Sequence, residues 1–367
     1  MYLLLNKNRV IARFVIEDTL GFEGVRIIDI DNSFHHPLLS DIPSFILNRK
    51  APKNRQHIDK LLKLCGCDTL TGYLDVSHAL SLNDTLWVKR ENSNLCWEEV
   101  SLYTHPFNTT IARVAFDGGM FGKQLSSTSP EFGTNGTFAK CWVRENGVIK
   151  LIKCGSDGFS NCGLEPYSEY YASQVLSAFG VNHVEYGLTM RHGKLASKCR
   201  LFTSEDVGLV PFSEIHSNRN LPEILNWYHK HNLLDRFAEM IVADALIFNQ
   251  DRHLGNFGCL FDNNTGKIVG AAPLYDHNIS LFCYATNSDI DNNDTLQNYI
   301  ARTNLGPKLY NDFTSVARKL ITPSIRKKLI NMQGFKLHKH PRYNLPDWRI
   351  HRLNQLINWQ IAELLKH

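Results

Sequence analysis

The chain lacks the features that mark secreted, membrane-spanning and nucleic-acid-binding proteins. Its nine cysteines are odd in number and include no CxxC pair, so we expect free thiols and a reducing, cytoplasmic compartment. Only three consecutive leucines stand near the N-terminus, and no apolar run approaches the length of a membrane-spanning helix. The net charge of +4 is too small and too scattered for a dense basic stripe. We therefore expect a soluble protein with no membrane partner and no direct nucleic-acid motif.

The residues that are present have the composition of a globular protein. Of the 367 residues, 43% are hydrophobic, 11% aromatic and 21% charged, which excludes a disordered or collagen-like chain. A chain of this length forms two modest domains or one large bilobal domain, each with its own core.

Periodicity divides the chain into three parts. Residues 1–105 hold a predicted hairpin at 2–16 and a predicted helix at about 54–65, and we interpret them as an α+β module of unknown role. Residues 106–205 are rich in strands, and residues 206–367 are rich in helices. We therefore predict an α+β fold in which a small strand-rich lobe precedes a large helical lobe.

Several elements within these parts can be placed. In the small lobe we expect strands at 138–144 and 148–153, joined by a turn, and then a helix at about 167–179. In the helical lobe, residues 233–248 are apolar around most of the helix circumference, which is typical of a central buried helix. Further helices are predicted at 307–321, 324–332 and 347–365.

The strongest chemical signal follows the predicted central helix, in the sequence NQDRHLGNFG at 249–258. A predicted hairpin after it ends at Asp276. Phosphoryl transfer needs one carboxylate to accept the proton of the attacking hydroxyl, and an amide and a second carboxylate to hold Mg²⁺. In protein kinases the catalytic Asp precedes the metal-binding Asn by five residues, as Asp251 precedes Asn256 here. We predict that Asp251 is the base and that Asn256 and Asp276 are the metal ligands.

A kinase must also hold the phosphates of ATP from its strand-rich lobe. Lys153 ends a predicted strand and Glu169 lies in the first turn of the next helix, which is the usual order of the phosphate-binding Lys and its Glu partner. Lys150 is the competing lysine and projects from the opposite side of the strand. On the central helix, Asp244 either orients the catalytic loop or forms a buried salt bridge.

Two more segments complete the predicted ATP site. The polar loop before the first of these strands contains Thr134, Asn135 and Gly136 and is a candidate phosphate cover, although it lacks the G-x-G-x-x-G spacing. Its hydroxyls, from Ser126 to Thr137, are candidate sites of self-phosphorylation. The segment with Lys198, Cys199 and Phe202 joins the two lobes, and we predict that adenine stacks there.

These motifs together resemble the HipA-type serine/threonine kinases of bacteria. The resemblance rests on the sequence at 249–258, on APLYD at 272–276, on TNG at 134–136, on LIK at 151–153, on EPYSE at 165–169 and on SKC at 197–199. It covers roughly residues 110–300 with specific motifs and is least specific before residue 105.

The resemblance implies a bilobal fold related to protein kinases, with ATP and Mg²⁺ as cofactors and a protein Ser or Thr hydroxyl as acceptor. It also implies that His253 supports the catalytic Asp251. Some members of the family are growth-arresting toxins that phosphorylate translation factors, are restrained by an antitoxin and phosphorylate themselves. The chain departs from the family pattern at two places. Asn278 stands where a glycine is common, which bears on the movement of the metal-binding loop, and the first 105 residues do not match the usual partner-binding domain, which weakens the toxin role.

Two alternatives remain open from the sequence. Small-molecule and lipid kinases share the same Asp, Asn and Asp set, so the acceptor is not fixed by these residues. A catalytically inactive binding module would keep the fold and recruit a partner through the N-terminal module.

Overall fold

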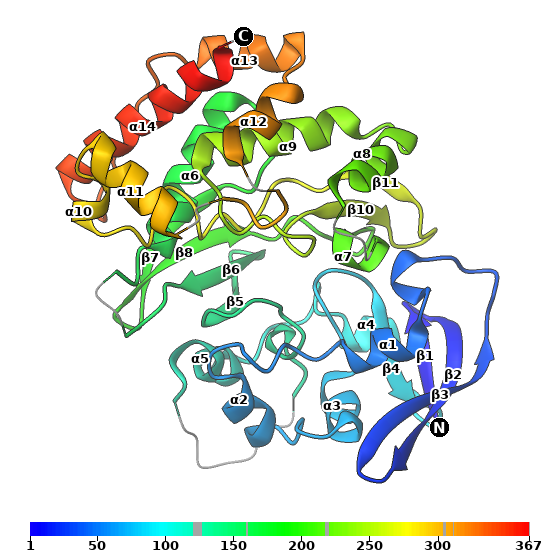
Figure 1. Ribbon diagram of the computed structural model, residues 1–367. Coiled ribbons are helices and arrows are strands. Elements are labelled where there is room, and N and C mark those ends of the chain that lie inside the picture. The colour runs from blue at the N-terminus through cyan, green and yellow to red at the C-terminus, as the bar shows by residue number, and fades with distance from the viewer. Residues whose placement is uncertain (120–126, 159–160, 217–219, 304–305, 311, 367) are drawn as a thin grey trace. The chain divides into compact units, whose positions relative to one another are not determined.

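The computed structural model describes residues 1–367 except 120–126, 159–160, 217–219, 304–305, 311 and 367 (Figure 1). The chain folds into two compact units. Unit 1 consists of Met1–Lys153, Arg200–Val210 and Cys259–Gly270, and unit 2 of Cys154–Cys199, Pro211–Gly258 and Ala271–His367. The predicted domain boundaries at 105 and 205 stay a prediction.

Unit 1 contains most of the strands. Its elements in chain order are β1 (Tyr2–Asn6), β2 (Arg9–Thr19), β3 (Phe22–Ile30), η1 (Pro37–Leu39), α1 (Ile42–Leu47), α2 (Ile58–Leu64), α3 (Leu70–Ser77), β4 (Leu86–Arg90), α4 (Trp97–Val100), α5 (Thr109–Asp117), η2 (Pro130–Phe132), β5 (Lys140–Glu145), β6 (Val148–Cys154), β9 (Val207–Pro211), β10 (Gly258–Asp262) and β11 (Ile268–Ala271).

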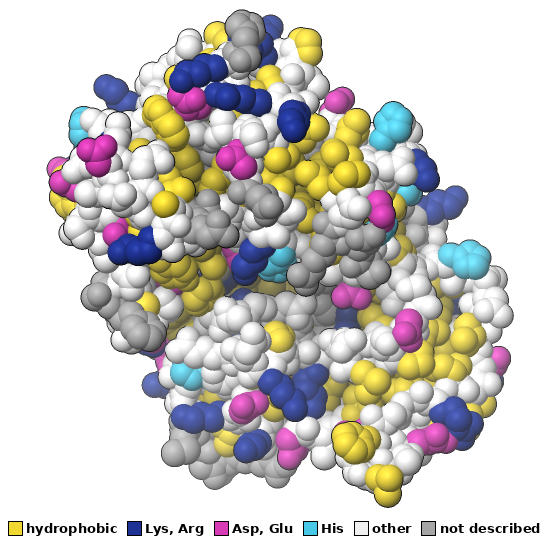
Figure 2. Space-filling view, viewed as in Figure 1, with side chains coloured by type: hydrophobic (Ala, Val, Ile, Leu, Met, Phe, Trp, Pro, Cys, Tyr) yellow, Lys and Arg dark blue, Asp and Glu magenta, His cyan; other side chains and the backbone are white. Residues whose placement is uncertain are grey.

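The first strands of unit 1 form an antiparallel sheet in the order β3-β2-β1-β4. All five residues of β1 are buried, because it lies inside the sheet and is apolar except at its end. The predicted hairpin at 2–16 is confirmed, and its second strand extends to Thr19. Hydrophobic side chains are visible on the surface over β1–β3 (Figure 2), and Phe22 on the edge strand β3 is 80% exposed.

The predicted strand pair of the small lobe is confirmed as the antiparallel hairpin β5–β6. Asn146 and Gly147 both have positive φ angles at its turn, the conformation that favours this Asn-Gly pair in two-residue hairpin loops. Trp142 of β5 and Ile149 of β6 belong to a buried cluster that also contains Leu3 and Trp87 of the N-terminal sheet. The N-terminal module and the hairpin therefore share one compact unit.

Unit 2 contains most of the helices. Its elements are α6 (Glu165–Phe179), β7 (Tyr186–Arg191), β8 (Lys194–Arg200), α7 (Phe212–Ile215), α8 (Leu221–Lys230), α9 (Leu234–Ile247), α10 (Asn287–Ile290), α11 (Asn293–Thr303), α12 (Phe313–Lys319), α13 (Pro323–Asn331) and α14 (Asp347–Leu365).

Helix α9 is the centre of unit 2. Every residue from Phe237 to Ile247 is buried, which confirms the predicted central buried helix. It packs against α6, α8, α12 and α14, which surround it in Figure 1. A helix that is covered on all sides in this way holds its C-terminal end in a fixed position.

One predicted helix was wrong in its extent. Residues 307–321 were expected to form one helix, but α12 begins only at Phe313, after the N-cap residue Asp312. The Tyr310 amide donates to the Pro307 carbonyl oxygen at 3.3 Å, so the preceding residues form a turn. The apolar residues of this turn, Leu309 and Tyr310, are buried, and together with Phe313 they have the i+3 and i+4 spacing of a helix.

All nine cysteines are free thiols. Within the described residues, no helix has both the length and the apolar character needed to cross a bilayer.

Candidate active site

The candidate catalytic loop of unit 2 begins where α9 ends. Phe248 closes the helix in the left-handed conformation, with a φ of 52°, and the Asn249 amide donates to the Asp244 carbonyl oxygen at 3.0 Å. This reversal turns the chain out of the core directly before Asp251. The Asn249 side-chain oxygen accepts from the Asp251 amide at 3.0 Å, which fixes the backbone at that residue.

A buried ion pair holds the loop on helix α9. Arg252 donates from Nε to Asp244 Oδ2 at 2.8 Å and from Nη2 to Asp244 Oδ1 at 2.9 Å, and both side chains are fully buried. Burial opposes the charge of Arg252, but the facing Asp244 carboxylate outweighs burial and raises the pKa of the guanidinium. The two alternatives that the sequence left open for Asp244 therefore coincide: the residue forms a buried salt bridge and thereby positions the loop.

The same guanidinium connects two distant segments of the chain. Arg252 Nη1 donates to the Asn256 carbonyl oxygen and lies 3.4 Å from the Tyr275 carbonyl oxygen. Asn256 is one predicted metal ligand, and Tyr275 directly precedes the other, Asp276. One buried side chain thus fastens the two backbones that carry the predicted metal ligands.

Three of the predicted site residues lie together in the catalytic loop. Asn256 Nδ2 donates to the Asp251 carbonyl oxygen at 3.0 Å and lies 3.3 Å from Asp251 Oδ2. His253 Nε2 lies 3.9 Å from the same carboxylate oxygen, and its Nδ1 accepts from the Gly255 amide at 3.0 Å. Burial lowers the pKa of His253, against the opposing effect of Asp251, which favours the neutral ring.

Asp276 is held by its backbone. It adopts a φ of 59°, which is uncommon for an aspartate, and its amide donates to the hydroxyl oxygen of Tyr186 on β7 at 3.1 Å. Burial raises the pKa of Tyr186 well above its usual value, with Glu169 as the next cause, so the hydroxyl stays protonated. Glu169 on α6 is itself buried and accepts from the Ser197 hydroxyl of β8.

Helix α6 also fixes the segment that follows Asp276. The Ser168 hydroxyl oxygen lies 2.7 Å from the His277 carbonyl oxygen and 2.9 Å from the Ser280 carbonyl oxygen, and it accepts from the Ser280 amide at 2.9 Å. This contact gives a structural role to the serine of the sequence EPYSE, which the sequence analysis noted only as part of a motif.

The structure also brings a lysine to the site that the sequence analysis missed. Lys308, in the turn before α12, donates from Nζ to Asp251 Oδ1. The two residues are 57 positions apart in the chain, and no local pattern links them.

Unit 1 holds the predicted phosphate-binding residues. Lys153 is 6% exposed and pairs in register with Lys140 across the β5–β6 hairpin. Two lysines directly opposite each other point to the same face of the hairpin. By contrast, Lys150 forms an ion pair with Glu145 at 2.7 Å.

The candidate phosphate loop lies beside this lysine pair. Lys140 Nζ donates to the Asn135 carbonyl oxygen at 2.7 Å, and Gly136 has a φ of 94°. The Thr134 hydroxyl donates to the Pro130 carbonyl oxygen at 2.6 Å and accepts from Trp142 Nε1 at 2.8 Å. The Thr134 hydroxyl is therefore hydrogen-bonded both to the loop and to β5.

The remaining predictions for the ATP site stay predictions. Lys198 and Cys199 lie on β8 in unit 2, and Phe202 belongs to unit 1. Lys153 belongs to unit 1 and Glu169 to unit 2, so no distance within one unit tests their predicted pairing. Ser126, the first of the candidate self-phosphorylation sites, lies outside the described residues.

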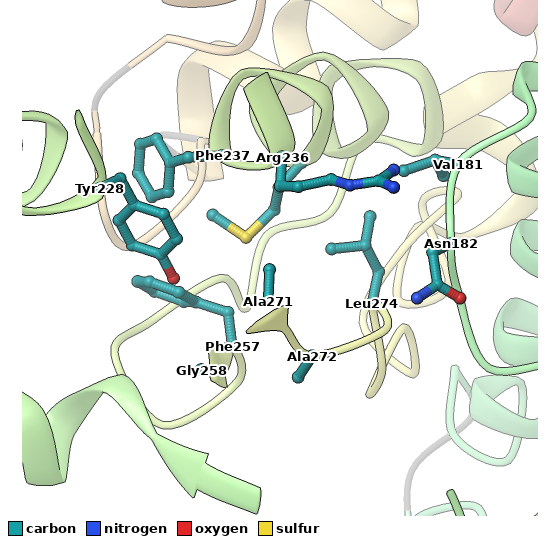
Figure 3. A pocket seen from close by; sticks show the side chains of 11 residues that line it. Val181, Asn182, Tyr228, Arg236, Phe237, Phe257, Gly258, Ala271, Ala272 and Leu274 are labelled. Carbon is teal, nitrogen blue, oxygen red and sulfur yellow. The ribbon is translucent and has the colours of Figure 1, made fainter. Parts of the chain in front are cut away.

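A small pocket lies next to the catalytic loop, lined in part by Tyr228, Phe237 and Phe257 (Figure 3). The ring centroids of Tyr228 and Phe237 are 4.7 Å apart, and those of Phe237 and Phe257 are 5.9 Å apart. Its volume of about 30 Å³ has room for a water molecule but not for a nucleotide. We interpret the pocket as part of the aromatic packing that anchors Phe257, the residue after Asn256.

We predict that the buried ion pair is essential for the stability of unit 2. Arg252→Met leaves the Asp244 charge buried without its partner, so the free energy of unfolding should fall by roughly 3–5 kcal/mol. Urea unfolding measures the loss. Arg236→Met is the matched control, because Arg236 is paired with Glu239 at 3.0 Å but its side chain is 55% exposed. The control should lose no more than about 1 kcal/mol, and equal losses in the two variants would contradict the assignment.

The chain is similar to known kinases in both sequence and fold. No model of a protein family matches it. In sequence it is 29% identical over 126 residues to the serine/threonine-protein kinase CtkA of Helicobacter pylori. That match covers 30% of this chain and 38% of the relative, so the chain spans less than two thirds of the length of the curated relative it matches.

Two solved structures share the fold. The crystal structure of the Helicobacter pylori proinflammatory kinase CtkA has a TM-score of 0.50 at 21% identity, covering 65% of this chain and 92% of that one. HipA of Shewanella oneidensis, solved as a toxin–antitoxin complex with HipB and operator DNA, has a TM-score of 0.52 at 11% identity, covering 99% of this chain and 96% of that one. The α+β fold of this chain is therefore the kinase-like fold of CtkA and HipA, and its resemblance to the HipA-type kinases is confirmed.

Proposed function

We propose that the chain is an ATP- and Mg²⁺-dependent serine/threonine protein kinase of HipA type. The observation that supports this most is the position of Arg252, which joins the backbone of Asn256 to that of Tyr275. It places the loop with the candidate base and the segment with the second candidate metal ligand on one buried anchor. The sequence similarity to CtkA supports the same activity.

In the proposed reaction the acceptor hydroxyl oxygen forms a bond to the γ-phosphorus of ATP. The bond from that phosphorus to the β–γ bridging oxygen breaks, and ADP leaves with the electron pair. Asp251 accepts the proton of the hydroxyl. Its side chain is 13% exposed and its backbone is fixed by Asn249, so the carboxylate reaches solvent in a defined orientation. His253, whose Nε2 lies 3.9 Å from the carboxylate, is the proposed supporting residue.

Asn256 and Asp276 fit a magnesium site because Mg²⁺ prefers carboxylate and amide oxygens. Asn256 donates from Nδ2 to the Asp251 carbonyl oxygen, so its Oδ1 would be the atom that holds the metal. When bound, Mg²⁺ supplies positive charge that neutralises the phosphates. Hydrogen bonds to Arg252 and Tyr186 hold the backbones of Asn256 and Asp276, the two residues that would bind the metal.

The phosphates of ATP are the proposed ligands of Lys153 and of the loop with Thr134, Asn135 and Gly136. Both Lys153 and Lys140 are buried and lie opposite each other on one face of the hairpin, so two cationic side chains lie beside this loop. Glu169 is the proposed partner of Lys153, and Lys198, Cys199 and Phe202 are the proposed adenine-binding segment.

Partners and regulation extend the proposal. The HipA structure contains HipB and operator DNA. By analogy we propose that this chain has an antitoxin partner. We also propose that it arrests growth in the cytoplasm and that its substrate is a translation factor. Self-phosphorylation would modify a hydroxyl of the phosphate loop. Of its described hydroxyls, Thr137 is exposed, whereas Ser129 is buried.

The first test replaces the proposed base. Asp251→Asn keeps the size of the side chain but cannot accept the proton, so transfer from γ-labelled ATP should fall by about 10²–10⁴-fold, with the thermal midpoint within a few degrees. Asp235→Asn, at an exposed position on α9, is the control and should keep full activity. If Asp251→Asn transfers phosphate as fast as the wild type, the proposal is wrong.

The second test identifies the acceptor. Incubation of the full chain with labelled ATP and intact lysate should label serine or threonine in protein bands, and mass spectrometry of the same sample should locate any modified hydroxyl of the phosphate loop. Asp251→Asn gives the background. Label that appears only in lipids or small metabolites would replace the protein-kinase proposal by the lipid or small-molecule alternative.

A further inference from the structure

The turn that carries Lys308 is built to hold that residue at the catalytic loop. Pro307, Leu309 and Tyr310 around it are all buried, whereas the side chain of Lys308 is 61% exposed. The Tyr310 hydroxyl lies 3.5 Å from the Ile241 carbonyl oxygen on α9. The turn is therefore anchored on the same helix that leads to Asp251, and only the lysine projects from it.

An ion pair with so exposed a lysine contributes little to the stability of the fold. Stability therefore does not explain this ion pair, and its chemical effect on the site is the relevant property. The contact puts an ammonium group on one oxygen of the proposed base, while the other oxygen lies near Asn256 and His253.

An ammonium group has three N–H donors, and the contact with Asp251 uses one of them. In the transfer that we propose above, the γ-phosphate passes directly beside the base, because the base takes the proton of the oxygen that attacks it. The two remaining donors can therefore reach oxygens of the γ-phosphate without loss of the contact with Asp251.

We propose that Lys308 is a catalytic residue that binds the γ-phosphate of ATP and stabilises the negative charge on it during transfer. This inference rests on the proposed function and adds a residue to it. It distinguishes Lys308 from Lys153, because the corresponding lysine of protein kinases binds the α- and β-phosphates. The alternative is a purely structural ion pair. In that case the nucleotide would bind equally well without the lysine.

The test compares two nucleotides that differ in the γ-phosphate. Isothermal titration of the full chain with Mg²⁺ and either AMPPNP or ADP measures both affinities. Lys308→Met should weaken AMPPNP binding by about tenfold and change ADP binding by less than twofold, and Lys308→Arg should restore most of the loss. Lys327→Met is the control, because Lys327 lies exposed on α13. A loss that is equal for both nucleotides, or no loss, overturns the inference.

Turnover provides the second readout. Lys308→Met should lower kcat by about 10²–10³-fold, with the acceptor KM within threefold of the wild-type value. A kcat that stays within threefold of wild type, or that rises because the lysine had been blocking the base, overturns the inference. If the wild type binds both nucleotides but transfers no phosphate, the proposed function fails. The affinities for AMPPNP and ADP then still decide whether Lys308 binds the γ-phosphate. If the wild type binds neither nucleotide, both proposals fail.

Discussion

Asp244 and Arg252 form an ion pair that is completely removed from solvent. Removing two charges from water costs several kcal/mol for each ion, and only good geometry and additional hydrogen bonds offset that cost. Both are present here. The Asp244 carboxylate accepts from Arg252 and from the Asn249 side chain, and the remaining guanidinium nitrogen reaches two backbone carbonyl oxygens. Through Asn249 and Arg252, this pair is linked to Asp251, to Asn256 and to Tyr275, the residue before Asp276.

In the rest of the site, too, buried side chains hydrogen-bond to the backbone of the segments that carry the candidate site residues. Tyr186 holds the amide of Asp276, and Ser168 holds the carbonyl and amide groups that follow it. The uncommon left-handed backbone of Asp276 persists because these contacts over-determine it. A metal site built on such a frame pays little conformational entropy when the metal binds.

The parts of this arrangement that are encoded locally could be predicted from the sequence. Helix α9 was predicted because it is apolar around its circumference, and the positions of Asp251 and Asn256 followed from their spacing. The role of Arg252 could not be predicted, because a charged residue in a polar loop after a helix is usually exposed. Its burial depends on Asp244 one helical turn inside the core, together with the turn at Phe248 that folds the loop back.

Lys308 could not be found for a different reason. Its turn reads as a helix in the sequence because Leu309, Tyr310 and Phe313 have nearly helical spacing, and its contact with Asp251 exists only after α9 and α12 have packed together. The pairing of Lys153 with Glu169, which the sequence order suggests, likewise depends on tertiary structure and remains a prediction.

The central claim is that Asn256 and Asp276 hold a divalent metal next to the base Asp251, and metal binding tests it most directly. Mn²⁺ can replace Mg²⁺ at oxygen ligands and is visible by electron paramagnetic resonance. In the presence of AMPPNP the wild-type chain should bind Mn²⁺ at a site whose affinity falls by at least about tenfold in Asp276→Asn and stays unchanged in Asp235→Asn. Equal Mn²⁺ affinity in all three proteins would contradict the account.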